Sequence, residues 1–265
     1  MELNGKRILI TGATGGIGEL VASQLHAEGS QLILSCYQAE ALEKLNAKLG
    51  GSHTIACEDI SSFEGRQFII ETCQSVGGID VVINLAGILN FDLFENQAPQ
   101  LIEKTIAINL NAPMLLCHDL IPILKQNSEA MILNVGSIFA SIGHPGFVAY
   151  CASKAGLKCF TEALSRELAD TSIKVCYIAP RATNTKLNND SVNRLNSALG
   201  NKSDSPEYVA NEIVQSIKKN RALAYLGWPE KLFVVVNAIL PGVVRKSLVG
   251  KLDMIKQYAT LGQNS

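Results

Sequence analysis

The opening segment constrains the fold most, because a short β-branched run leads into a glycine-rich turn and then into a helical pattern. Residues 6–11 (KRILIT) predict a strand, and the apolar spacing of residues 20–27 predicts a helix. In the turn between them (GATGGIG), Gly12 permits a tight bend, Gly16 lets the backbone approach a pyrophosphate, and Gly18 lets the helix pack close to the strand. The helix N-terminus then faces the phosphates, so a dinucleotide site is expected here.

The rest of the chain alternates between short apolar runs and helical patterns. Further strands are predicted at residues 31–36, 53–57, 79–84, 130–137, 173–178 and 222–226. Helical periodicity covers residues 40–49, 63–75, 99–125, 150–169 and 206–218. This alternation predicts an α/β fold, a Rossmann-like doubly wound parallel sheet of about seven strands with helices on both faces and ligands at the carboxyl ends of the strands.

Composition bounds the domain organisation and excludes some function classes. The 265 residues contain no Pro/Ser-rich linker, charge block or repeat, so we expect one domain, with a dinucleotide-binding and catalytic part at residues 1–227 and a C-terminal helical extension at residues 228–265. The net charge of -1 and the absence of a basic stripe argue against nucleic-acid binding.

The cysteines and the N-terminal residues indicate a compartment. Seven cysteines are scattered without the spacing of a zinc site or the density of a disulfide framework, so reduced thiols are expected. The first residues enter a predicted strand directly and show no charged-then-apolar secretion signal. We therefore expect a cytoplasmic location.

A candidate reactive group lies in the second half of the chain. Tyr150 and Lys154 are four residues apart, so on a helix they share one face. A nearby ammonium favours the phenolate and lowers the pKa of a phenol from about 10, which would let Tyr150 act as a general acid or base. Ser137 ends a predicted buried strand, where its hydroxyl would hold a substrate oxygen beside this pair.

Several motifs together resemble the short-chain dehydrogenase/reductase family. They are TGATGGIG at 11–18, Asp59 with Ile60 after the third strand, NLAG at 84–87, Asn109, Ser137, YCASK at 150–154 and PRATNT at 180–185. The resemblance runs in order from about residue 6 to residue 226. It implies an NAD(P)-dependent oxidoreductase that transfers a hydride between a nicotinamide cofactor and a ketone or secondary alcohol.

The resemblance also implies a role for each catalytic residue. Tyr150 would be the general acid/base at the substrate oxygen. Lys154 would bias the phenol and hold the nicotinamide ribose, while Ser137 would hydrogen-bond the substrate oxygen. Asn109 would anchor a water that links Lys154 to solvent, or else it is a residue at a helix kink with a satisfied side chain. No metal takes part in this mechanism.

The cofactor contacts follow from the same motifs. Gly12, Gly16 and Gly18 resemble the phosphate turn, Asp59 and Ile60 the adenine contacts, and Asn84 the adenosine contact at a strand end. Thr185 would meet the nicotinamide carboxamide. The expected cofactor-binding set further contains Thr14, Ile17, Tyr37, Ala86, Gly87, Tyr150, Lys154, Pro180 and Thr183.

Three departures from the family pattern matter. Leu85 stands where a second Asn is usual, and Arg181 replaces the usual Gly after Pro180, which affects the backbone path beside the nicotinamide. At the end of the second strand, Cys36 takes the place of the acid that would bind the ribose of NAD, and Tyr37 follows instead of a basic residue. The cofactor is NADP or NAD, and the missing acid favours NADP.

The last residues leave the family pattern. After Trp228 come an apolar run and a second helical pattern, and residues 227–265 carry five basic and two acidic residues, a net +3 that leaves -4 for the remainder. This tail suits packing on its own domain, a subunit contact, a membrane surface, or a lid over an apolar substrate pocket. Its apolar run is shorter than the roughly 20 residues that span a bilayer.

The tail and residues 186–203, which resemble a mobile substrate loop, favour a lipophilic substrate such as a fatty-acyl or steroid-like carbonyl. The family also implies a homodimer or homotetramer. The alternative function is a non-catalytic dinucleotide-binding module, regulatory or peripheral to a membrane, although such a module has no need of Ser137, Tyr150 and Lys154.

Overall fold

The computed structural model describes residues 1–261 and contains a parallel sheet of seven strands in the order β3-β2-β1-β4-β5-β6-β7. The strands are β1 (Arg7–Thr11), β2 (Gln31–Cys36), β3 (Thr54–Cys57), β4 (Val81–Asn84), β5 (Ala130–Val135), β6 (Ile173–Ala179) and β7 (Leu223–Tyr225). The strand order reverses direction between β1 and β4, which is where a doubly wound sheet opens a crevice for ligands. The predicted Rossmann-like fold is confirmed.

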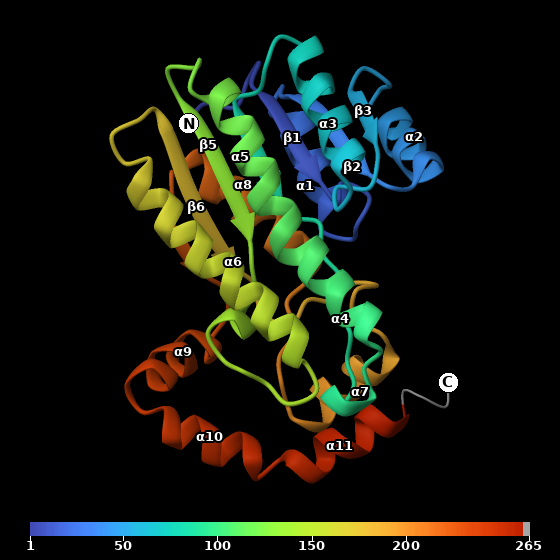
Figure 1. The fold of residues 1–265 in the computed structure, drawn as a ribbon, viewed down its shortest axis with the longest axis vertical. Helices are drawn as coiled ribbons and strands as arrows, with labels where there is room; N and C mark the ends of the chain where they lie inside the picture. Colours follow the sequence, from blue (N-terminus) through green and yellow to red (C-terminus); the bar gives the residue numbers. More distant parts are fainter. Residues whose placement is uncertain (262–265) are drawn as a thin grey trace.

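Helices cover both faces of the sheet (Figure 1). One face carries α1 (Gly18–Ala27), α2 (Ala39–Lys48) and α8 (Pro206–Lys218), and the other carries α3 (Phe63–Ser75), α5 (Ala112–Leu124) and α6 (Val148–Glu167). Because neighbouring side chains of a strand point to opposite faces, Ile8 and Ile10 join the first core while Leu9 joins the second. The continuous apolar strands of the sequence follow from this burial on both faces.

The predicted helix at residues 99–125 is interrupted. It consists of α4 (Pro99–Ile106), a π-helical turn (Ala107–Asn111) and α5. By length and composition alone, residues 99–124 are apolar enough to cross a membrane. However, Leu116 and Leu120 are fully buried against the sheet, so this segment is a core helix on that side.

The C-terminal extension forms three helices below the carboxyl ends of the strands (Figure 1, red). They are α9 (Glu230–Ile239), α10 (Pro241–Val249) and α11 (Leu252–Leu261). Ile255 and Ala259 of α11 enter a third buried cluster with Tyr150 of α6 and with Val192 of α7 (Asp190–Ala198). The segment expected to be a substrate loop, residues 186–203, therefore contains a helix that the tail covers.

Candidate active site

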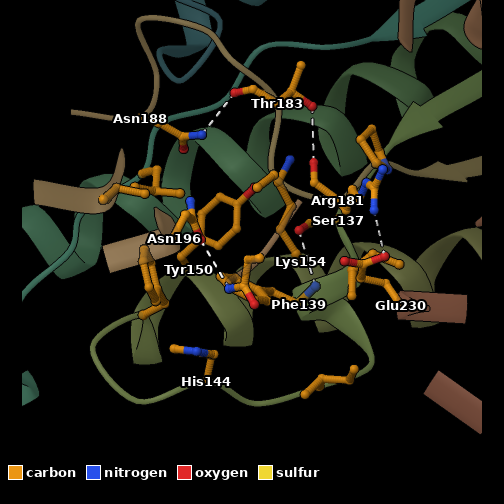
Figure 2. Close-up of a pocket in the computed structure, with 18 of the residues that line it drawn as sticks. Ser137, Phe139, His144, Tyr150, Lys154, Arg181, Thr183, Asn188, Asn196 and Glu230 are labelled. Atoms are coloured by element: carbon orange, nitrogen blue, oxygen red, sulfur yellow. Dashed lines mark hydrogen bonds and ion pairs between the residues drawn. The ribbon is translucent and has the colours of Figure 1, made fainter. Parts of the chain in front are cut away.

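The three expected catalytic side chains meet at the carboxyl end of β5. Ser137 follows that strand and caps a 3₁₀ turn (Ile138–Ala140), where its Oγ accepts a hydrogen bond from the N–H of Phe139 at 3.1 Å. Tyr150 and Lys154 lie on the first turns of α6 and are only 7% and 5% exposed. Figure 2 shows the three side chains grouped in the middle of one cavity.

Burial sets the electrostatics of this group. Desolvation raises the pKa of Tyr150 to about 12, against the opposing effect of its hydrogen bond with Ser137. Burial also lowers the pKa of Lys154 to about 8. The expectation that the pKa of the phenol is lowered is therefore wrong for this structure, because desolvation of the Tyr150 side chain is the largest effect and raises the pKa. At neutral pH Tyr150 carries its proton.

Asn109 lies in the π-helical turn and is fully buried. Its Oδ1 accepts a hydrogen bond from the N–H of Ile88 at 2.8 Å, while its Nδ2 donates to the Ile88 carbonyl at 2.8 Å and to Ser153 Oγ at 3.1 Å. The side chain therefore fixes the loop after β4 to α6. The side chain has the satisfied contacts of the alternative interpretation, and a Cβ on Gly87 would lie 3.2 Å from Asn109 Oδ1 and 3.5 Å from Lys154 Nζ, so the loop after β4 is close to both side chains.

The glycine turn has the shape that a diphosphate needs. Gly12 has φ +68°, and a Cβ there would lie 2.8 Å from the Cα of Ala86, while a Cβ on Gly18 would collide with the carbonyl oxygens of Gly12 and Ala13. A side chain on Gly16 would instead point across the groove to Thr185, 3.1 Å away. No side chain caps the start of α1, so the helix N-terminus is open to an anion, although the N–H of Glu19 already donates to the Gly15 carbonyl at 3.0 Å.

These features fit a nicotinamide dinucleotide. The backbone of Gly87 leaves a gap beside Lys154, where a Cβ would lie 3.5 Å from Nζ. Lys154 donates a hydrogen bond to the Val135 carbonyl at 3.1 Å, and an ammonium has three donors, so its remaining hydrogens can serve ribose hydroxyls. Gly87 and Lys154 line the same cavity as Ile17 of the glycine turn.

Two expected adenosine contacts have side chains that turn into the core. The Nδ2 of Asn84 donates to Asn134 Oδ1 at 2.8 Å and to Cys117 Sγ at 3.3 Å, and Ile60 joins the core on that face of the sheet. Only the backbones of Asn84 and Ile60 can meet a cofactor. Ala86 likewise contributes backbone, since its N–H donates to Thr11 Oγ1 at 3.2 Å and its Cα lies against Gly12.

Asp59 and Tyr37 lie on loops at the carboxyl ends of β3 and β2, on the side of the crevice away from Tyr150. The Oδ1 of Asp59 accepts hydrogen bonds from the N–H and the hydroxyl of Ser61, and Tyr37 is 72% exposed. Cys36 at the end of β2 accepts a hydrogen bond from Thr14 Oγ1 at 2.9 Å. The position that would select between the two nicotinamide dinucleotides thus holds a cysteine whose side chain is hydrogen-bonded to the glycine turn.

The loop after β6 forms the opposite wall of the cavity (Figure 2). The carbonyl of Pro180 accepts a hydrogen bond from Ile138, the Thr183 carbonyl accepts from the N–H of Thr185 at 2.8 Å, and it also accepts from Asn188 Nδ2 at 2.9 Å. This chain of bonds aims Thr185 at the glycine turn. Pro180, Thr183 and Thr185 all line the cavity on this side.

Arg181 does not obstruct this loop, because its side chain turns toward the C-terminal extension. The guanidinium pairs with Asp204 at 2.6 Å and with Glu230 of α9 at 3.0 Å, and it donates to the Trp228 carbonyl at 3.1 Å. A Cβ at Gly227 would lie 2.6 Å from Cδ of Arg181. Arg181 therefore clips the loop after β6 to the start of α9, a role that its position in a motif did not reveal.

The cavity has a volume of about 590 Å³ and is largely apolar beyond Tyr150. The sequence indicated an apolar pocket beside the tail and residues 186–203 but named none of its apolar lining residues, which include Phe139, Ile142, Phe147, Leu187, Val192, Leu199, Phe233, Val244 and Leu248. Several of these residues belong to segments without a recognisable motif. The residues of α9 and α10 are distant in sequence from the catalytic group and come to the cavity only when the chain folds. The one available signal was the apolar content of the tail and of residues 186–203.

Comparison with known proteins agrees with this geometry. The family model for short chain dehydrogenase matches residues 6–196. Nodulation protein G of Rhizobium sp. (strain N33) is 30% identical over 243 residues, which cover 90% of this chain and 96% of that protein. The 3-oxoacyl-[acyl-carrier-protein] reductase FabG of Rickettsia felis is 37% identical over 180 residues, 68% of this chain and 73% of that one.

Among solved structures, the 3-ketoacyl-(acyl-carrier-protein) reductase of Brucella melitensis complexed with NADH superposes with a TM-score of 0.78 at 26% identity. The match covers 84% of this chain and 96% of the Brucella chain.

Proposed function

The chain belongs to the short-chain dehydrogenase family, and on that premise we propose that it transfers a hydride between a nicotinamide dinucleotide and a lipophilic ketone or secondary alcohol. The observation that carries the proposal is the buried group of Ser137, Tyr150 and Lys154 at one wall of the cavity. The glycine turn beside it supplies the fit for a diphosphate.

When bound, the cofactor supplies or accepts the hydride at the substrate carbon. In reduction, Tyr150 gives its proton to the carbonyl oxygen, so that the C=O bond gains one hydride and one proton. Ser137 holds the same oxygen, and its Oγ is fixed for this by the hydrogen bond that it accepts from Phe139. Lys154 stabilises the phenolate that remains and returns a proton to it.

The ionisation of the site favours the reductive direction. A phenol with a pKa of about 12 is protonated at neutral pH and ready to donate, whereas oxidation of an alcohol requires the phenolate. We therefore propose carbonyl reduction as the reaction near neutral pH, with alcohol oxidation gaining as the pH rises.

For the cofactor we propose NADP. Cys36 and Tyr37 place no carboxylate where one would repel a 2'-phosphate. The Sγ of Cys36 accepts a hydrogen bond from Thr14 Oγ1 at 2.9 Å, so this side chain is held against the glycine turn beside that position. NAD then remains the weaker ligand.

For the substrate we propose a fatty-acyl or steroid-like carbonyl. The cavity volume of about 590 Å³ lies in the range of sites for drug-sized ligands, and one part of it adjoins the nicotinamide side at Gly87 and Thr185. The remainder is lined mainly by apolar side chains, which include Phe147, Phe233 and Leu248, with polar side chains such as Asn196 and Lys202 between them. Such a lining favours an apolar chain or ring system over a small polar carbonyl.

We also propose that the protein is a homo-oligomer that works in the cytoplasm. The outward side of α5 exposes Met114 and Leu115, which suits a contact between copies of the chain. All seven cysteines are free thiols, which suits a reducing compartment. Light scattering coupled to size exclusion tests the first point.

The direct test is a panel of carbonyl compounds assayed with NADPH. Long-chain and polycyclic ketones should be reduced with kcat/KM at least about tenfold above that of small polar ketones, as expected for several extra buried methylene groups. Equal rates across the panel would contradict a lipophilic substrate. No turnover of any ketone or alcohol would leave a dinucleotide-binding module.

A further inference from the structure

The outer side of the C-terminal hairpin carries an apolar surface that faces away from the protein. Leu232, Val235 and Ile239 of α9 follow a spacing of three and four residues, so they share one helical face. Trp228 lies in the turn just before this helix. Leu240 and Val243 continue the surface across the bend into α10. All six side chains are at least half exposed, up to 72% for Ile239. We call these six residues the outer apolar patch.

The opposite side of the same hairpin is engaged with the body of the protein. Phe233 of α9 and Val244 and Leu248 of α10 line the substrate cavity. Asn237 donates a hydrogen bond to the Ser141 carbonyl at 2.8 Å, and Arg181 holds Glu230 at the start of α9. The hairpin is therefore oriented, with one face on the cavity and the other directed outward. Within residues 1–261, the outer apolar patch meets water.

The charges around the patch point to an anionic partner. Lys231, Arg245 and Lys246 lie on the hairpin itself, and Lys256 lies on α11. Lys251, between α10 and α11, lines the cavity instead. Of the two acidic residues in this region, Glu230 is already paired with Arg181, which leaves Asp253. A two-fold contact with a second copy would bring these cations toward their own counterparts. An apolar face bordered by basic residues instead matches anionic lipid headgroups.

The shape of the hairpin limits how it can enter a bilayer. Together, α9 and α10 have the length and apolar composition of a membrane span, but they bend by 118° at their junction. A helix pair with such a bend does not cross a bilayer as one straight rod. It fits shallow insertion into one leaflet, with the apolar bend at Ile239 and Leu240 as its deepest part.

We propose that the hairpin of α9 and α10 docks the protein on the surface of a membrane that contains anionic lipids, with the outer apolar patch at the boundary between headgroups and acyl chains. The inference deepens the proposed function and rests on it in one respect. Phe233 of α9 and Leu248 of α10 line the substrate cavity. Because these helices would lie at the membrane, a lipophilic carbonyl dissolved in the bilayer passes beside them directly into the cavity.

Co-sedimentation of the full chain with vesicles tests the docking without any substrate. Wild-type protein is expected to sediment with vesicles of phosphatidylcholine and phosphatidylglycerol, and less with phosphatidylcholine alone. Val235→Glu/Ile239→Glu should lower the partition coefficient at least about tenfold, since two buried aliphatic side chains are lost. Arg245→Glu/Lys246→Glu should remove the preference for anionic vesicles. Phe68→Glu, at an exposed aromatic residue of α3, is the matched control and should bind as wild type does.

Two results would overturn the proposal. One is wild-type protein that stays in the supernatant with both kinds of vesicle. The other is an oligomer that Val235→Glu/Ile239→Glu dissociates while vesicles capture neither protein, which would assign the patch to a second copy of the chain. Melting curves confirm that the variants fold, and none of the substituted residues lines the cavity.

Kinetics separate this inference from the proposed function. The variant Val235→Glu/Ile239→Glu should lose kcat/KM at least about tenfold for a long-chain ketone held in vesicles and keep it for a water-soluble ketone, because only the first substrate arrives through the membrane. Equal losses for both ketones would contradict delivery from the membrane. Vesicle binding without any carbonyl reduction would remove the proposed function and leave the docking surface in place.

Discussion

The Nζ atom of Lys154 lies 5.9 Å from the centre of the Tyr150 ring and donates a hydrogen bond to the Val135 carbonyl at 3.1 Å. The two side chains lie one helical turn apart on α6, and burial favours the uncharged form of each. It raises the pKa of Tyr150 to about 12 and lowers that of Lys154 to about 8. A bound cofactor and substrate would replace the missing water with fixed hydroxyl and carbonyl groups. Burial of these two groups therefore lowers the stability of the fold while it keeps the phenol protonated for proton donation.

The lowered pKa of Lys154 predicts that this residue destabilises the folded protein at neutral pH. The pKa of Lys154 falls from 10.5 to about 8 on folding. The protein therefore pays no penalty above pH 10.5, where the amine is neutral in both states, and the free energy of unfolding falls as the pH decreases from 10.5 to about 8. Each pKa unit is worth about 1.4 kcal/mol, which exceeds the roughly 1 kcal/mol of the hydrogen bond to Val135. Lys154→Met should thus raise the Tm at pH 7 and abolish turnover.

Thermal unfolding at pH 7 and near pH 10.5 measures this effect. The gain in Tm should shrink toward zero at the higher pH, where the amine is neutral in both the folded and the unfolded chain. A Lys154→Met protein that melts below wild type at pH 7 would contradict the assigned pKa shift.

The clip made by Arg181 predicts that the C-terminal extension depends on it. Arg181→Met leaves Asp204, a carboxylate with 8% side-chain exposure, without its cation. The free energy of unfolding should fall by roughly 2–3 kcal/mol, and proteolysis after residue 228 should become faster. Denaturant titration and limited proteolysis measure the two effects. The double variant Arg181→Met/Asp204→Asn is the control and should recover part of the loss; no recovery would mean that the pair is not the cause.

Two glycines of the turn should separate binding from folding. A Cβ on Gly16 enters the groove toward Thr185, so Gly16→Ala should weaken NADPH binding at least about tenfold while the Tm changes little. A Cβ on Gly18 collides with the backbone of Gly12 and Ala13, so Gly18→Ala should lower the Tm markedly. Fluorescence titration and melting curves distinguish the pair, and similar effects at both positions would contradict the assigned roles.

The thiol at the end of β2 should decide between the dinucleotides. Cys36→Asp places a carboxylate where a 2'-phosphate would sit, so the Kd for NADPH should rise at least about tenfold and the Kd for NADH should fall or stay unchanged. Cys36→Ser, which keeps an acceptor for Thr14, is the neutral control. If Cys36→Asp left the NADPH affinity intact, the 2'-phosphate would bind elsewhere.

The sequence was sufficient for what depends on local pattern. The glycine turn, the alternating strands and the Tyr150/Lys154 spacing predicted the sheet and the cavity wall, because each is set by residues close together in the chain. The helix at residues 99–125 was predicted as continuous, since periodicity does not reveal that Asn109 sits in a π-helical turn to bond the loop after β4.

Burial and long-range contacts were out of reach of the sequence. Spacing shows that Lys154 adjoins Tyr150, but the direction of the pKa shift depends on the elements that cover both side chains. The role of Arg181 likewise requires that Asp204 and Glu230, far along the chain, come together. Asn84 was expected as an adenosine contact at a strand end, and the sequence did not reveal that its side chain lies in the core, where strand pairing places it beside Asn134.

The central claim is tested most directly by Tyr150→Phe, which removes the phenolic oxygen and keeps the ring in its buried cluster. NADPH affinity is measured by fluorescence titration, and turnover is measured on the best ketone of the panel. The account predicts a Kd within about twofold of wild type and a loss of kcat of at least about a thousandfold, within the range attributed to general acid–base catalysis. Turnover retained at a wild-type rate would contradict the assignment of Tyr150 as the proton donor.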